Sequence, residues 1–154
     1  MVMATAGFCS QELLEKERKI KLNQTVNAIV NADTEALRSI MSSEYQTMSK
    51  AEATLILKRI TLSWGDLTQL KRVDESKLEK PFSKGNMVPI IHWGTQPTHH
   101  GRWILFRSSK RKNHYLRIGL LFGKGVANSG QIIVVEMPVL QKVRPDSSQV
   151  ESVK

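Results

Sequence analysis

The stretch His114-Tyr-Leu-Arg-Ile-Gly-Leu-Leu-Phe122 decides the fold, because it predicts a β-strand with one buried face. Successive side chains of a strand point to opposite faces, so the even-numbered residues from His114 to Phe122 share a face that is mostly Leu, Ile and Phe. Tyr115, Arg117 and Gly119 share the other face. One apolar face and one mixed face are typical of an antiparallel sheet that covers a core on one side.

Further runs on both sides of this strand are rich in Ile, Val and aromatic residues and are separated by turn residues. They predict strands over Met87–Trp93, Arg102–Ser108 and Gln131–Met137. Pro89 cannot donate a hydrogen bond to a neighbouring strand, which places the first of these runs at a sheet edge or a bulge. Leu67–Val73 is ambiguous between a strand and a helical turn, and residues 74–86 are predicted to form a loop or an irregular hairpin.

Residues 10–64, which precede the strands, carry helical signals. Asp33 or Thr34 caps a short second helix, and Ser49-Lys-Ala-Glu52 matches the capping box at the start of a third helix that Gly65 ends. Helices followed by a run of strands predict an α+β fold. We expect three N-terminal helices packed on a C-terminal antiparallel sheet of four to five strands.

The length of 154 residues is typical of a single domain with a core of its own. We expect that domain over residues 10–143, after a flexible segment at 1–9 and before a disordered polar tail at 144–154. Ser10 is the predicted N-cap of the first helix. Cys9 is the only cysteine, so no internal disulfide is expected. The first ten residues lack the features of a signal peptide, and no apolar run has the length of a membrane span, so an intracellular protein, cytoplasmic or nuclear, is the expectation.

The net charge of +9 belongs to one part of the chain. Residues 80–135 contain nine basic residues and no acidic one, whereas the other 14 basic residues are matched by 14 acidic residues. A helical part at 10–65 is therefore close to neutral, and a basic β part at 80–143 carries the excess. A surface that only needs solvation usually mixes both signs, so this asymmetry favours an anionic partner.

A basic surface with aromatic residues is the pattern expected for RNA or single-stranded DNA, because cations bind phosphates and flat rings stack on bases. The candidate residues come from two predicted strands and their connecting loop, and they are Arg102, Trp103, Arg107, Lys110, Arg111, Lys112, Tyr115 and Arg117. Trp103 and Tyr115 would stack on bases and the others would bind phosphates. The alternative is that Trp103 and Leu105 are buried beneath the helices and that the basic loop is a solvated hairpin tip.

The four histidines suggest neither a metal site nor an evident catalytic centre. His92, His99, His100 and His114 have no Asp, Glu or Cys nearby in the sequence, and their spacing fits no standard metal pattern. Two histidines could cleave a phosphodiester as general acid and base, which would give RNA cleavage that depends on His99 and His100. We expect a protein without cofactor, and more readily a binding protein than an enzyme.

The segment Asn27-Ala-Ile-Val-Asn-Ala-Asp-Thr-Glu-Ala-Leu37, with Ser43-Glu44 behind it, resembles the start of NTF2-like domains. This resemblance implies a curved sheet that encloses a pocket for an apolar small molecule, with Trp93, Trp103 and Phe106 as its lining. It also implies, as a further alternative, a module that binds a protein partner or forms a homodimer. The Asp/His pair of the catalytic NTF2-like members is not recognisable, so no activity is transferred.

The layout from Ile90-Ile-His-Trp-Gly94 through Arg102-Trp-Ile-Leu-Phe-Arg107 resembles the nucleic-acid-binding core of plant-virus movement proteins of the thirty-kilodalton superfamily. This resemblance implies a role in viral movement or RNA handling. The Asp that the family has after the second strand is absent, and Ser108 and Ser109 stand there instead.

Overall fold

A computed structural model gives the fold of the chain. The residues that it describes are 2–43, 46–73, 82–84, 87–94, 100–108, 110–111, 114–127 and 129–141. Among these, no helix is long and apolar enough to cross a membrane.

Three α-helices precede the strands, which confirms the predicted α+β class. The helices are α1 (Val2–Val30), α2 (Thr34–Met41) and α3 (Lys50–Trp64), followed by a short 3-10 turn η1 (Leu67–Gln69). The strands are β1 (Lys71–Val73), β2 (Phe82–Lys84), β3 (Val88–Trp93), β4 (His100–Arg107), β5 (His114–Phe122) and β6 (Ser129–Gln141).

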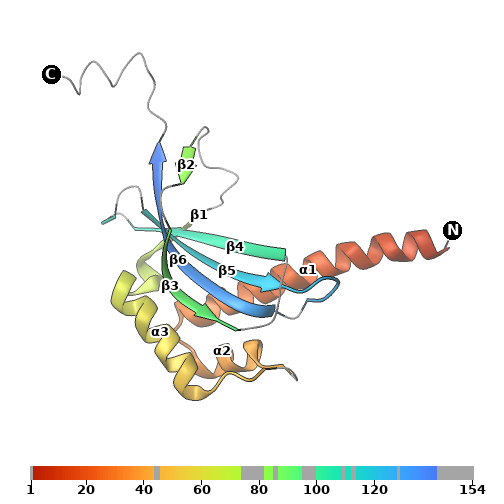
Figure 1. Ribbon diagram of the computed structural model, residues 1–154, viewed down its shortest axis with the longest axis horizontal. Coiled ribbons are helices and arrows are strands. Elements are labelled where there is room, and N and C mark those ends of the chain that lie inside the picture. The colour runs from red at the N-terminus through yellow and green to blue at the C-terminus, as the bar shows by residue number, and fades with distance from the viewer. Residues whose placement is uncertain are drawn as a thin grey trace, which may run out of the picture.

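All strand pairs are antiparallel, and β1, β4, β5 and β6 lie side by side in that order. β6 is long enough to pair with two strands on its other side, with β3 near its middle and with β2 at its end. Figure 1 shows the helices gathered on one side of this curved sheet, with α1 continuing beyond it. The sheet is therefore covered by helices on one face, and the other face points away from them.

The core lies between that covered face and the helices. Leu116, Ile118, Leu120 and Phe122 of β5 are buried there together with apolar residues of all three helices. Tyr115, from the same strand, packs instead with a small cluster that contains Leu105 and Met137. The alternation predicted for β5 is therefore confirmed.

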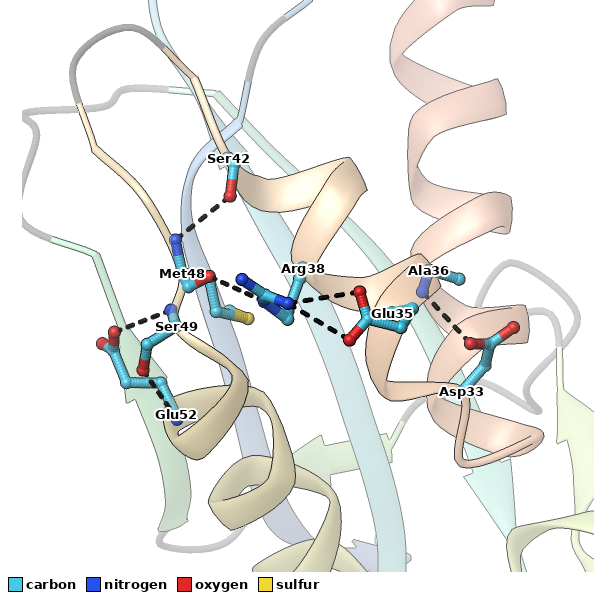
Figure 2. A network of polar contacts seen from close by, with 8 residues as sticks. All are labelled: Asp33, Glu35, Ala36, Arg38, Ser42, Met48, Ser49 and Glu52. Atoms are coloured by element: carbon cyan, nitrogen blue, oxygen red, sulfur yellow. Dashed lines mark hydrogen bonds and ion pairs between the residues drawn. The ribbon is translucent and has the colours of Figure 1, made fainter.

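The predicted caps of α2 and α3 are present. The Asp33 carboxylate accepts a hydrogen bond from the Ala36 amide, and the Ser49 hydroxyl and Glu52 carboxylate each accept one from the other residue's amide. Gly65 ends α3 with a φ of +75°, a conformation that favours glycine. Figure 2 shows how Arg38 of α2 joins this helix to the segment that precedes α3, since its guanidinium binds Glu35 of α2 and the Met48 carbonyl.

The structure differs from the sequence-based expectations at three places. α1 begins at Val2, so Ser10 lies inside the helix instead of capping it; the preceding residues, which include Met3, Ala4 and Ala6, contain no helix-breaking proline. β2 is a strand within the stretch that was expected to be a loop or irregular hairpin. β6 continues to Gln141, beyond the predicted end at Met137.

Two further expectations concern Pro89 and the C-terminal tail. β3 pairs with β6, and this pairing shifts register between Pro89 and Ile91, which agrees with the predicted edge or bulge. The tail at 144–154 lies outside the described residues.

Replacement of the capping serine, Ser49→Ala, should destabilise the protein by about 1 kcal/mol, because the first turn of α3 loses the hydroxyl that accepts from the Glu52 amide. Urea denaturation would measure the change. Ser39→Ala, an exposed serine within α2, is the matched control and should change stability by less than about 0.5 kcal/mol. Equal effects of the two substitutions would contradict a stabilising role of the capping box.

Candidate nucleic-acid interface

The sheet face that points away from the helices, here called the outer face, brings together four of the predicted residues. β4 and β5 pair in a register that places Trp103 opposite Gly119, Leu105 opposite Arg117, and Arg107 opposite Tyr115. Residues directly opposite each other in an antiparallel pair point to the same face, so the aromatic and cationic side chains of both strands are neighbours. Trp103, Arg107, Tyr115 and Arg117 are the predicted residues in this group.

The indole of Trp103 lies across two glycines. A Cβ atom built on Gly119 would come within 2.0 Å of Cε3 of the indole, and one built on Gly101 within 2.8 Å of its Nε1. The guanidinium carbon of Arg117 lies 4.0 Å from the ring centroid. Trp103 is half-buried, so the alternative in which it lies in the core beneath the helices is not what the structure has. The glycines, the indole and the guanidinium form a stack that we call the Trp103 stack.

Exposed cations lie further along β4 and in the connection that follows it. Lys71 of β1 pairs with Arg107, which in turn pairs with Tyr115, so the three residues form one row across the outer face. Lys71, Arg107 and Lys110 are all exposed. The sequence did not identify Lys71 because Leu67–Val73 reads equally well as a helical turn. Its position follows only from the pairing of β1 with β4.

The structure separates Arg102 from the other candidates. Its side chain points to the covered side of the sheet and forms an ion pair with Glu15 of α1, in which Nε donates to Oε1 at 2.7 Å. These hydrogen bonds hold the pKa of Glu15 below its ordinary value, and the same pair raises the pKa of Arg102. Arg102 therefore joins helix and sheet, and its charge is compensated.

Arg111 has a similar structural role in the connection between β4 and β5. It binds the Glu136 carboxylate and the Ser63 carbonyl, and its guanidinium carbon lies 4.8 Å from the centroid of the Trp64 ring. A cation near the carbonyl end of a helix is favourable, because that end carries partial negative charge. Arg111 thus fastens the connection to the end of α3. Lys112 lies outside the described residues.

The histidines are dispersed over the sheet. Nε2 of His92 lies 2.9 Å from the side-chain oxygen of Gln131, and Nδ1 of His114 lies 3.9 Å from Glu136. His100 pairs with Phe122, the last residue of β5. His114 is the first residue of that strand, so His100 and His114 lie about 26 Å apart along it. His99 lies outside the described residues. In the part of the chain that the structure describes, no group of three His, Cys, Asp or Glu side chains could hold a metal ion.

The cavity expected between Trp93, Trp103 and Phe106 is not formed by these three residues. Phe106 is buried in the main core, and the indole of Trp93 donates to the Glu52 carboxylate of α3 at 2.6 Å. Trp103 lies on the outer face. Alternation along β4 places Trp103 and Phe106 on opposite sides of the sheet, and this separation excludes a shared pocket.

The Glu15–Arg102 pair predicts a loss of stability in acid. Because the pKa of Glu15 is lowered on folding, its contribution is fully present above the unfolded value of about 4.5 and is lost as the pH falls through the folded pKa. At pH 7, Glu15→Gln should cost at most about 1 kcal/mol, since the pair is partly exposed. Urea titrations at pH 7 and at successively lower pH should show this cost decreasing once the pH falls below about 4.5. Glu17→Gln, at an exposed position, is the control, and a cost independent of pH would contradict the ion-pair interpretation.

No family model, no curated protein and no solved structure matches this chain.

Proposed function

We propose that the protein binds RNA or single-stranded DNA through its outer face, without catalysing a reaction. Lys71, Arg107 and Lys110 bind phosphates in this proposal. Tyr115 and the Trp103 stack provide flat surfaces for bases. An RNA-handling role, including viral movement, would use binding of this kind.

The observation that carries the proposal is the Trp103 stack on a sheet face that also carries exposed cations. In this stack the guanidinium of Arg117 lies over the indole. Bases stack on guanidinium planes as well as on aromatic rings, and each stacked base contributes on the order of 1–3 kcal/mol. The two glycines leave room for the indole to lie close to the sheet, so its ring is part of the surface and not of the core.

Charge supports the same proposal. Residues 80–135 contain no carboxylate that could compete with a phosphate. Glu136, which follows them, binds Arg111 on the covered side of the sheet. Among the residues that the structure describes, Arg107 and Lys110 form no ion pair with a carboxylate, and phosphates of a nucleic acid would be attracted by them.

Reversal of two charges, Arg107→Glu with Lys110→Glu, tests the proposal. Fluorescence titration with a labelled single strand should show at least a tenfold loss of affinity. The dependence of log K on log salt should become shallower by about 1.4, because two phosphate contacts are lost. Lys58→Glu with Arg59→Glu, an exposed pair on α3, makes the same change in net charge away from the sheet. Equal losses in both variants, or wild-type binding that is undetectable or independent of salt, would overturn the proposal.

A further inference from the structure

A cleft of about 360 Å³ opens at the edge of the sheet, where α1 passes β1 and β4. Its walls include Lys19, Leu22 and Asn23 from the helix and Arg72, Trp103 and Ile104 from the strands. This volume lies at the lower end of the range for small-molecule sites. The cleft therefore has room for one small ligand or for one unit of a polymer.

The lining combines an apolar wall with two cations. Leu22, Ile104 and the indole of Trp103 form the apolar part of the lining, against which a flat ring can pack. Arg102 also borders the cleft, but Glu15 compensates its charge. The other two cations of the lining are Lys19 and Arg72. An apolar wall beside two positive charges suits a base that carries a phosphate.

Arg72 is held in position by its neighbours. Its guanidinium donates to the side-chain oxygen of Asn23 at 3.1 Å, and the Asn23 amide group donates to the Lys19 carbonyl at 3.0 Å. The guanidinium carbon also lies 5.8 Å from the Phe106 ring centroid. Among the residues that the structure describes, these contacts occupy one of the five guanidinium donors of Arg72. The Lys19 side chain is exposed, and its ammonium group forms no hydrogen bond or ion pair with any residue that the structure describes.

Trp103 belongs both to this cleft and to the outer face. Its ring lies over the glycines of the sheet and also forms part of the cleft wall. We infer that the cleft holds one nucleotide of the bound strand, with the base against Trp103, Leu22 and Ile104 and the phosphate on Lys19 and Arg72. This inference rests on the proposed function, since the strand would reach the cleft across the outer face.

The test compares two surfaces with one labelled oligouridylate of twelve nucleotides. The double variant Lys19→Glu with Arg72→Glu should bind this oligouridylate about tenfold more weakly than the wild type. In a second measurement, uridine 5′-monophosphate at millimolar concentration should shift the amide NMR signals of Asn23 and Ile104 in the wild type but not in this variant. Lys19→Glu alone is a second variant, because the Lys19 side chain is exposed and its replacement leaves the core intact. It should weaken binding about threefold. Lys58→Glu is its control.

The outcomes distinguish the inference from the proposed function. If the oligouridylate binds the wild type and both cleft variants equally, and only the outer-face variant binds weakly, the cleft inference is wrong and the proposed function stands. If the oligouridylate does not bind the wild type, both are wrong. Weaker binding by the cleft variants without nucleotide-dependent shifts at Asn23 and Ile104 would also overturn the inference, since the charges would then act from a distance.

Discussion

Gly119→Ala should lower the free energy of unfolding by about 2–3 kcal/mol and displace the indole of Trp103 from the sheet. The added methyl group would lie within 2.0 Å of Cε3 and 2.3 Å of Cζ3, far inside van der Waals contact. Gly119 is buried in β5 between β4 and β6, so the strand cannot move away without breaking its ladder. Urea denaturation would measure the stability. Tryptophan fluorescence would report on the indole.

A double-mutant cycle isolates the cause of this loss. In a Trp103→Ala background the methyl group meets no ring, so Gly119→Ala should cost less than about 0.5 kcal/mol there. Gly123→Ala is a second comparison, because its Cβ would meet only the end of the Val126 side chain, at 3.1 Å. An undiminished cost in the Trp103→Ala background would mean that the glycine is needed for the backbone and not for the indole.

The same substitution bears on the proposed function. If bases stack on the Trp103 stack, a displaced indole should weaken binding of a single strand by about tenfold, which corresponds to one lost stacking contact. The exposed cations would remain in place, so the salt dependence of binding should be nearly unchanged. The charge reversal at Arg107 and Lys110, in contrast, should make the salt dependence of binding shallower.

Local chemistry explains which parts of the fold were predictable. The faces of β5 follow from strict alternation, and the start of α3 follows from a serine and a glutamate three residues apart. Both patterns depend on neighbours in the sequence. The predicted start of α1 at Ser10 was wrong, because the residues before Ser10 also form helix. A suitable cap residue does not by itself exclude an earlier start.

Pairing over long distances along the chain could not be predicted. Arg102 and Glu15 are separated by 87 positions, and nothing in either segment indicates that they meet. The count of charges along the chain described the helical part as neutral, yet Lys19 lies in a cleft with Arg72 at the sheet edge. Charge counted along a sequence locates a basic segment. It does not show which charges are compensated by another segment.

Arg18→Met should destabilise the protein by about 3 kcal/mol, because this arginine is buried and holds the β5–β6 connection against α1. Its Nε donates to the Val126 carbonyl at 2.9 Å and its terminal nitrogen to the Gly123 carbonyl at 2.8 Å. The guanidinium carbon lies 5.5 Å from the Phe122 ring centroid. Methionine keeps much of the apolar stem but leaves both carbonyls without these donors, and hydrogen bonds to a charged group contribute about 1.5–3 kcal/mol each. The midpoint of urea unfolding would measure the loss.

Arg59→Met, at an exposed position of α3, is the matched control and should change stability by less than about 0.5 kcal/mol. A loss below about 1 kcal/mol for Arg18→Met would mean that water replaces the arginine at both carbonyls. Arg18 also precedes Lys19 in the helix, and its two hydrogen bonds fix the rotation of α1 that presents Lys19 and Asn23 to the sheet edge. Arg18→Met should therefore weaken nucleotide-dependent shifts at Asn23 even where the protein remains folded, whereas Arg59→Met should leave them unchanged.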